Sequence, residues 1–297
     1  MYKILIVDDE HIIRSMLEEE LQEKYRVFTA IDGSEALNLC KKESFDLVLS
    51  DINMPGIKGP DLLYQIKTNY PSTKTVLMTS YNIDDYIRMA KDYRISNIMP
   101  KTTPFNFDEL SRLVENLTAE EIFGIKKYLK PEVQIIKTYE IKSSTEVEKI
   151  EDEIVKIVEE RYGKSKFLKM LLEEIISNAI YHAPMVNDHE KYEKHSEVNL
   201  EPTEYVDVEF ACDDEKYAIA IVDKSGKLTT RTILYKLDRH IHADGLFDED
   251  GRGLHMSRIY SDRLIINIKP NLKTEIIIIN YTKEKYKGFK PLYINEL

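Results

Sequence analysis

The sequence predicts two α/β domains in tandem: first a doubly wound domain around a parallel five-stranded sheet, then a two-layer α+β domain. Three observations predict this order. The chain has 297 residues, which is long for a single core. Short apolar runs alternate with amphipathic stretches over residues 1–116, whereas most strand-like runs after residue 133 follow helix-like segments. Hydrophobic residues make up 42% and charged residues 32%, so both parts can bury a core.

The first part contains five apolar runs that alternate with five amphipathic segments. The expected strands are Ile4–Val7, Val27–Thr29, Leu47–Leu49, Thr75–Met78 and Ile95–Met99. The expected helices lie near 11–24, 33–42, 59–68, 83–92 and 106–116. This alternation predicts a parallel sheet with helices on both faces, in which a functional site lies beyond the carboxyl ends of the strands.

A connector is expected over residues 118–132. Thr118 and Glu121 have the spacing of a capping box ahead of a short helix at 119–129, and Pro131 stops its continuation. The segment is not rich in Gly or Ser, so we expect a semi-rigid link. The domains are therefore predicted at 1–117 and 133–297.

The second part is predicted to begin with a strand and two helices. Ser143 and Glu146 open the first helix, whose stripe of apolar residues faces a core. The remaining assignments run in chain order: strand 135–141, helices 143–158 and 165–183, a charged loop at 184–204, strands 206–210 and 217–222, a variable segment to about 250, a helix at 253–260, strands 264–268 and 275–280, and a tail that packs back on either domain.

The composition excludes several classes of partner and location. The net charge of −11 and pI of about 5.3 disfavour direct contact with a phosphate backbone, so no nucleic-acid partner is expected. No apolar run reaches the roughly 18 residues needed to span a bilayer. The N-terminus lacks the pattern of a signal peptide, and Cys40 and Cys212 are far apart in sequence. We expect a cytoplasmic protein.

Three carboxylates occur at strand ends of the first part. Asp8 and Asp9 follow the first strand, and Asp51 follows the third. Because a parallel sheet brings neighbouring strand ends together, these acids should cluster and bind a hard cation such as Mg²⁺. One carboxylate could then attack phosphorus, while Thr79 and Lys101, at the ends of the next strands, hold phosphoryl oxygens.

The strings SDINMPG, VDDE, LMTS and IMPK make residues 1–116 resemble the response-regulator receiver family. The resemblance implies a flavodoxin-like fold and a phosphoryl group received from a cognate histidine kinase. It also implies specific residue roles: Asp51 as phosphoacceptor, Asp9 and Asp51 as Mg²⁺ ligands supported by Asp8 and the Asn53 backbone carbonyl, and Thr79 and Lys101 as sensors of the phosphoryl group.

A second site is expected in the later part, without a P-loop string. Glu174 and Asn178 are four residues apart and share one helix face, where an amide oxygen can ligate Mg²⁺ and a carboxylate can accept a proton. Asp223 ends a strand. Gly251 and Gly253 precede a helix whose N-terminus favours phosphate.

The order of these motifs resembles the Bergerat, or GHKL, ATP-binding fold over residues 133–282. It implies ATP as ligand and these roles: Glu174 as base, Asn178 holding Mg²⁺ on the triphosphate, Asp223 reading the adenine amino group, Gly251 and Gly253 contacting phosphates, and Gly226, Leu254 and Thr274 completing the nucleotide site. The family's D-x-G-x-G string reads DKSGK here, with Ser225 and Lys227 in place of its two glycines.

Three hypotheses for the output remain open. No histidine occurs between His11 and His182, so phosphorylation of a histidine upstream of the ATP domain, as in histidine kinases, is excluded within this chain. The segment before Glu174, a strand and one amphipathic helix that lead into the Asn-bearing helix, looks most similar to the anti-sigma-factor kinases. This resemblance implies a receiver-gated Ser/Thr kinase of an anti-sigma antagonist. Alternatively, the domain binds or releases a partner such as a sigma factor without transfer, or it is only a docking surface of a phosphorelay adaptor. The Glu174–Asn178 pair favours the first, and DKSGK favours the others.

Gating through the connector is a further expectation. Phosphorylation of Asp51 should shift the face formed by the last receiver helices, and the helix at 119–129 should carry that change to the ATP domain. A symmetric homodimer would bring two ATP domains together.

Overall fold

The computed structural model describes residues 1–130, 135–163, 165–186, 189–194, 196–242, 244, 252–282 and 289–297. The chain forms two compact units. Unit 1 contains Met1–Ile122 and Gly288–Tyr293, and unit 2 contains Phe123–Lys287 and Ile294–Leu297. Within the described ranges, no helix has the length and apolar character that crossing a bilayer requires.

Unit 1 is built on a parallel sheet. Its strands are β1 (Lys3–Val7), β2 (Arg26–Ala30), β3 (Leu47–Asp51), β4 (Lys74–Thr79) and β5 (Asn97–Pro100). They lie in the order β2-β1-β3-β4-β5, and every pair among them is parallel. The apolar residues of β1, β3 and β4 are buried because helices cover both faces. The five expected strands and the flavodoxin-like α/β architecture are confirmed.

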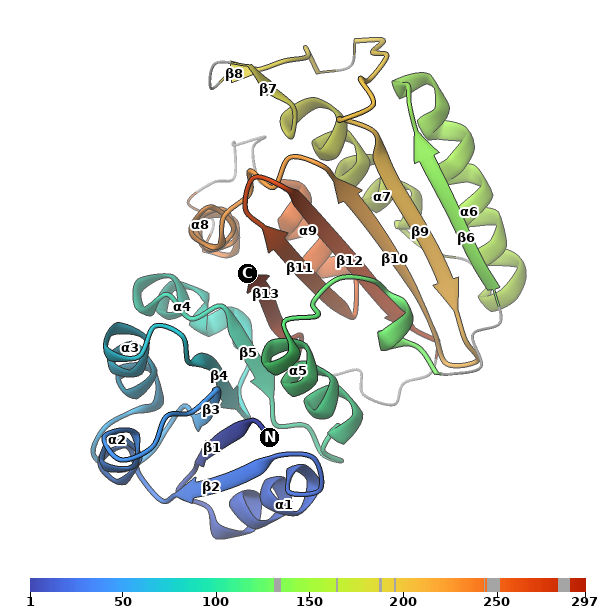
Figure 1. Ribbon diagram of the computed structural model, residues 1–297. Helices are drawn as coiled ribbons and strands as arrows, with labels where there is room; N and C mark the ends of the chain where they lie inside the picture. The colour runs from blue at the N-terminus through green and yellow to red at the C-terminus, as the bar shows by residue number, and fades with distance from the viewer. Residues whose placement is uncertain are drawn as a thin grey trace. The chain divides into compact units, whose positions relative to one another are not determined.

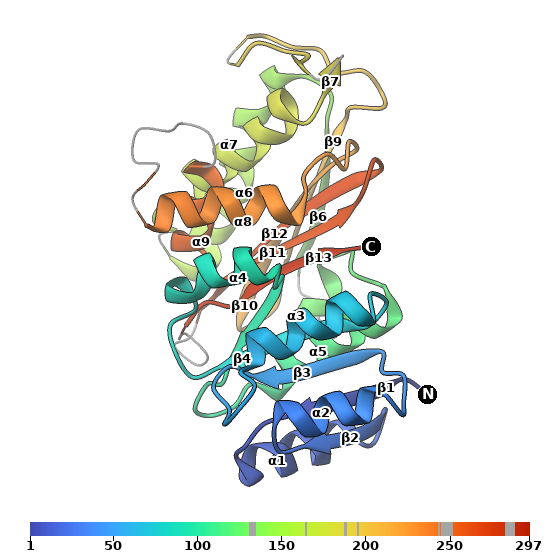
Figure 2. The same ribbon diagram turned by 90° about the vertical axis from the view of Figure 1, so that its left-hand side faces the viewer.

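The helices of unit 1 also follow the expected order. They are α1 (His11–Leu21), α2 (Gly33–Cys40), α3 (Gly59–Asn69), the 3₁₀ turn η1 (Ile83–Tyr86) with α4 (Ile87–Tyr93), and α5 (Phe107–Ala119). Helices α2, α3 and α4 cover one face of the sheet, and α1 and α5 cover the other (Figures 1 and 2). Asp32 fixes the start of α2, because its carboxylate accepts hydrogen bonds from the backbone N–H groups of Ser34 and Glu35.

One strand contributes residues to both units. In β13 (Leu292–Glu296), Leu292 pairs antiparallel with Ile98 of β5, and Tyr293 pairs with Asn97. The residues that follow belong to unit 2, where the backbone N–H of Leu297 donates to the carbonyl of Ile268 at 3.0 Å. The tail was expected to pack back on either domain, and its strand conformation was not anticipated.

The helix expected over residues 119–129 is not formed. Helix α5 continues to Ala119 and ends because Glu120 adopts a left-handed conformation with φ of 56°. Thr118 lies inside α5, and its hydroxyl donates to the carbonyl of Val114 at 2.8 Å instead of capping a new helix. The remaining regular structure up to residue 130 is one 3₁₀ turn, η2 (Lys126–Tyr128).

The segment after α5 is held by the sheet of unit 2. The backbone N–H of Gly124, whose φ is 91°, donates to both carboxylate oxygens of Glu275 at 2.9 and 3.1 Å. The N–H of Lys130 donates to Asp213 at 2.9 Å. The expected helix would have paired these backbone N–H groups internally. The hydrogen bonds to Glu275 and Asp213 satisfy them instead, so the connector is held in place without the α-helix expected at 119–129. Residues 131–132 of the expected connector lie outside the described residues.

The sheet of unit 2 includes five consecutive antiparallel strands among the described residues. These strands are β6 (Ile135–Ile141), β9 (Val206–Cys212), β10 (Lys216–Asp223), β11 (Arg263–Lys269) and β12 (Lys273–Tyr281). Their order is β11-β12-β10-β9-β6. The register aligns Asp223 with Thr274, which places two predicted site residues on adjacent strands.

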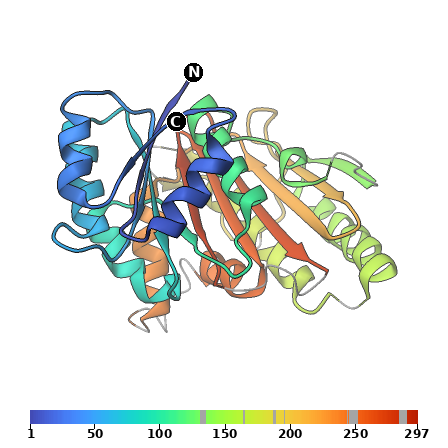
Figure 3. The same cartoon turned by 90° about the horizontal axis from the view of Figure 1, so that it is seen from below.

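Helices α6 (Val147–Tyr162), α7 (Leu168–Ser177) and α9 (Arg252–Tyr260) lie on one face of this sheet (Figure 3). The expected capping box of Ser143 and Glu146 is present in the 3₁₀ turn η3 (Ser144–Glu146) before α6. Two expectations need correction. The variable segment contains α8 (Thr230–Ile241), and the loop at 184–204 contains a short hairpin of β7 (Met185–Val186) and β8 (His189–Glu190).

Candidate functional sites

The first site lies at the carboxyl ends of β1, β3 and β5. The ammonium of Lys101 is 2.6 Å from Asp8 Oδ2 and also forms an ion pair with Asp51 Oδ1. Asp51 is the last residue of β3 and is largely buried, and its Oδ2 accepts a hydrogen bond from the backbone N–H of Asn53 at 2.6 Å. The structure therefore brings together three of the residues predicted from strand ends.

Thr79 and Gly59 complete the immediate surroundings of Asp51. Thr79 is fully buried at the end of β4, and its Oγ1 accepts from the backbone N–H of Tyr81 at 3.0 Å. The backbone of Lys101 is tied to the same strand, because its N–H donates to the Thr79 carbonyl at 2.7 Å. A Cβ on Gly59 would lie 2.0 Å from the backbone oxygen of Asp51, so α3 can begin here only with glycine.

Burial and pairing oppose each other at this site. Burial raises the pKa of Asp8, and the hydrogen bond and charge of Lys101 counteract part of that rise. Burial lowers the pKa of Lys101, but its hydrogen bonds to Asp51 and Asp8 prevail and leave that pKa above its ordinary value. Lys101 is therefore held as a cation between carboxylates, which suits a group that must meet phosphoryl oxygens.

The remaining predicted metal ligands lie at the exposed rim. The side chains of Asp9 and Asn53 are exposed. In the chain, Asp9 directly follows Asp8, and Asn53 follows Asp51 after one intervening residue. Among the described residues, no three Asp, Glu, His or Cys side chains gather into a metal-binding group. The predicted set has the Asp9 and Asp51 carboxylates and the Asn53 carbonyl. This fits Mg²⁺, which prefers oxygen ligands and usually keeps several waters.

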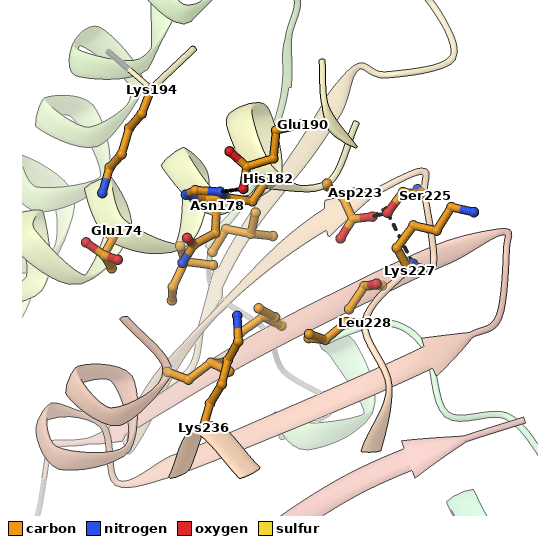
Figure 4. Close-up of a pocket in the computed structure, with 17 residues that line it drawn as sticks. Glu174, Asn178, His182, Glu190, Lys194, Asp223, Ser225, Lys227, Leu228 and Lys236 are labelled. Carbon is orange, nitrogen blue, oxygen red and sulfur yellow. Dashed lines mark hydrogen bonds and ion pairs between the residues drawn. The ribbon is translucent and has the colours of Figure 1, made fainter. Parts of the chain in front are cut away.

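The second site is a cavity of about 690 Å³ in unit 2 (Figure 4). Its volume is within the range of small-molecule sites. Helix α7 and the π-helical turn η4 (Asn178–His182) form one wall, and strands β10 and β12 form another. The predicted residues that line it are Glu174, Asn178, Asp223, Leu254 and Thr274.

Gly253 connects the two motifs at one end of the cavity. A Cβ at this position would lie 2.3 Å from Glu174 Cγ and 2.9 Å from Asn178 Nδ2. The start of α9 can therefore approach these two side chains only because residue 253 is glycine. Gly251, the other glycine of the predicted phosphate contact, lies outside the described residues.

Asp223 is organised by the loop that follows β10. Its Oδ1 accepts from Ser225 N at 2.9 Å, Ser225 Oγ at 2.5 Å and Gly226 N at 3.3 Å. Burial raises the pKa of Asp223, and these bonds oppose that rise. The buried Thr274 hydroxyl makes no hydrogen bond of standard geometry among the described residues, yet it is near enough to lower the pKa of Asp223. The other oxygen of Asp223 points into the cavity in Figure 4.

Gly226 is the predicted nucleotide residue that the structure places elsewhere. Its φ is 57°, and a Cβ would lie 2.3 Å from the carbonyl oxygen of Lys269, in the turn between β11 and β12. Its own carbonyl accepts from Asn271 N at 3.0 Å. This glycine therefore packs against the turn and is not among the residues that line the cavity.

Further polar residues that were not predicted to bind nucleotide also line the cavity, among them His182, Glu190, Lys194 and Lys236. His182 Nδ1 lies 2.5 Å from Oε1 of Glu190, which belongs to β8. Lys194 and Lys236 also line the cavity, from the 184–204 loop and from α8. His182 could have been found from its position one turn after Asn178, whereas the loop sequence gives no such signal.

A family comparison matches residues 4–115 to the response regulator receiver domain. The chain is 37% identical over 114 residues to the sporulation initiation phosphotransferase F of Bacillus subtilis, a match that covers 38% of this chain and 90% of that protein. It is 42% identical over 84 residues to the response regulator protein FleR of Pseudomonas aeruginosa, where the match covers 28% of this chain and only 18% of that protein.

Solved structures resemble the same share of the chain. The response regulator TrrA of Thermotoga maritima, solved with Mg²⁺-BeF, is 40% identical, and the match covers 39% of this chain and 99% of that one with a TM-score of 0.36. A complex of the histidine kinase ThkA with TrrA matches at 39% identity, over 39% of this chain and 98% of that one, with a TM-score of 0.35.

Proposed function

Residues 4–115 make this chain a member of the response regulator receiver family, and from that premise we propose that Asp51 accepts a phosphoryl group from a cognate histidine kinase. The observation that carries the proposal is the ammonium of Lys101 paired with both Asp8 and Asp51 at the strand ends. A carboxylate oxygen of Asp51 attacks phosphorus, the bond from phosphorus to the donor's histidine nitrogen breaks, and an acyl phosphate forms.

Mg²⁺ is the proposed cofactor of this step. Asp9, Asp51 and the Asn53 carbonyl would hold the ion, which neutralises charge on the transferring phosphoryl group. Lys101, which pairs with Asp51, and the hydroxyl of Thr79, at the end of the adjacent strand β4, would then meet the phosphoryl oxygens.

The test is incubation of the full chain with acetyl phosphate and Mg²⁺, followed by mass spectrometry. We expect one phosphoryl group on Asp51, none in Asp51→Asn, and unchanged labelling in Asp61→Asn, which removes an acid from α3. Equal labelling of Asp51→Asn and the wild type would overturn the assignment.

For unit 2 we propose an ATP-binding output domain of the GHKL type. The observation that carries it is the convergence of Glu174, Asn178 and Asp223 on one cavity. Asp223 would accept from the adenine amino group, and Asn178 would ligate the Mg²⁺ that neutralises the triphosphate. Gly253 lets the start of α9 approach the same end of the cavity, where backbone N–H groups favour phosphate.

The catalytic proposal is an anti-sigma-type Ser/Thr kinase. A substrate hydroxyl would attack the γ-phosphorus, its proton would pass to Glu174, and the bond to ADP would break. The substrate would be a small antagonist protein. Transfer of labelled γ-phosphate to a co-encoded partner would support this activity, provided that Glu174→Gln abolishes it.

A second candidate is an ATP-dependent binding switch without transfer, in which the partner is a sigma factor or an adaptor. The DKSGK loop favours it. The hydroxyl of Ser225 donates a hydrogen bond to Asp223 Oδ1, and the Lys227 ammonium is 3.4 Å from Asn271 Oδ1 in the neighbouring turn. Nucleotide binding with no transfer to any co-encoded partner would favour this switch over the kinase.

Calorimetry with Mg²⁺-ATP on the wild type and on Asn178→Ala tests the common premise. Micromolar binding that is lost in Asn178→Ala would support a nucleotide site, and no binding to the wild type would overturn it. Repeating the titration with a phosphoryl mimic on Asp51 tests gating, and sedimentation under the same conditions tests the proposed homodimer. Identical behaviour of Asp51→Asn and the phosphorylated wild type would remove the gating proposal.

A further inference from the structure

Residues 184–204, here called the insert, carry a lysine into the cavity. Lys194 is among the residues that line it, although its position in the chain is well beyond the helix that bears Asn178. Figure 4 shows the Lys194 side chain extending from the insert toward Glu174. The insert therefore contributes a cation to the end of the cavity where Glu174, Asn178 and Gly253 meet.

The insert is anchored on both sides of Lys194. On the N-terminal side, Tyr192 donates its hydroxyl to Glu204 at 2.6 Å, and Lys191 donates to the same carboxylate at 2.7 Å. On the C-terminal side, the hydroxyl of Tyr181 donates to the carbonyl of Ser196 at 2.8 Å. Because the Tyr192 side chain and the Ser196 backbone carbonyl are held in this way, less conformational entropy of the insert is lost when Lys194 engages a ligand.

The other acids of the cavity already have hydrogen-bond partners. Glu190 lies 2.5 Å from His182, and Asp223 accepts bonds from its own loop. Within the described residues, Lys194 has no hydrogen bond or ion pair, and Glu174 is the acid toward which it points. An ammonium in this position favours an additional anion beside Glu174, which a bound polyphosphate would supply.

We propose that Lys194 contacts the terminal phosphate of a nucleoside triphosphate and thereby makes the cavity discriminate triphosphates from diphosphates. The inference rests on the proposed ATP site and assigns one residue of the insert to it. The contact is made through a flexible ammonium, so it adds affinity for the terminal phosphate without restricting the base. Lys194 acts here as a binding and positioning residue, whereas Glu174 remains the proposed base.

The experiment compares Mg²⁺-ATP and Mg²⁺-ADP binding by calorimetry, using the full chain. We expect Lys194→Met to weaken ATP binding by about tenfold or more, the usual range for a lost hydrogen bond to a charged group, and to change ADP binding by less than about twofold. Lys194→Arg should retain most of the preference for ATP. Lys156→Met is the matched control, because it removes an equal charge from an exposed position of α6.

Thermal unfolding of each variant checks that its fold is intact. If Lys194→Met weakens ATP and ADP equally, or weakens neither, the proposal for Lys194 is overturned while the ATP site stands. If the wild type binds neither nucleotide, the ATP site itself is overturned, and the role of Lys194 with it. A selective loss for ATP that arginine restores is the supporting outcome.

Discussion

Glu151 offers a test of how the second unit carries a buried charge. It lies on α6 with 3% of its surface exposed, and its Oε1 is buried without a hydrogen-bond partner among the described residues. Burial raises the pKa of Glu151 to about 7, and the nearby charge of Glu173 adds to that rise while Lys169 opposes it. The perturbation is Glu151→Gln, which keeps the shape and removes the titration.

The sign follows from proton linkage. The pKa of Glu151 is about 4.5 in the unfolded chain and about 7 in the folded protein. Between these pH values the folded state binds the proton more tightly, so the free energy of unfolding falls as the pH rises from about 4.5 to about 7. A rise of that size corresponds to about 3 kcal/mol once both states are ionised. Because the amide of Gln is also a buried polar group, we expect a net gain of about 1–3 kcal/mol at pH 8 and little change at pH 5.

The assay is urea unfolding at pH 5 and pH 8, with hydrogen exchange of α6 peptides as a local readout, because a chain of two units need not unfold in one step. Glu160→Gln is the control, since Glu160 is exposed on the same helix. A stability difference between Glu151→Gln and the wild type that is equal at the two pH values would show that the pKa of Glu151 is not raised in the folded state.

Two further predictions concern the close packing of Gly253 and the buried carboxylate of Glu275. Gly253→Ala places a methyl group 2.3 Å from Glu174 Cγ, so we expect ATP affinity to fall by about tenfold or more in calorimetry; unchanged affinity would mean that α9 can retreat without cost. Glu275→Leu removes the acceptor of Gly124 and of Asn267, which donates at 2.8 Å. We expect it to lower the free energy of unfolding in urea by about 2–4 kcal/mol, and a loss below 0.5 kcal/mol would contradict a structural role for this carboxylate.

The first site could be predicted closely because it depends on strand ends. Asp8, Asp51, Thr79 and Lys101 each end or follow an apolar run, and the parallel order of the runs brings them together whatever the exact helix boundaries are. The pairing of Lys101 with two acids needed the structure, since sequence spacing does not specify which carboxylate an ammonium reaches.

The misassigned segments have local causes. The Thr118–Glu121 spacing predicts a helix start. In the structure Thr118 instead lies in the last turn of α5, where its hydroxyl donates a hydrogen bond to the backbone carbonyl of Val114. Helix α8 was predictable from the sequence, because Thr229 is a suitable N-cap residue and Ile233, Leu234 and Leu237 have the spacing of a buried helical stripe.

Long-range features could not be predicted in this way. The strand conformation of Leu292 and Tyr293 depends on pairing with β5, nearly 200 residues earlier, and strand formation responds more to such partners than to local preference. Lys194 has no sequence signature, because its position at the cavity depends on hydrogen bonds that Tyr192 and Ser196 make with residues distant in the sequence, Glu204 and Tyr181.

The strand shared by the two units has a consequence for synthesis and for dissection of the chain. Leu292 and Tyr293 leave the ribosome after residues 123–287, so the amino-terminal fold must wait for them with one side of β5 uncovered. A fragment cut after Ile122 would keep that side open permanently. Unpaired backbone groups along a strand invite pairing with another molecule, so self-association of such a fragment would report on its missing strand and not on phosphorylation.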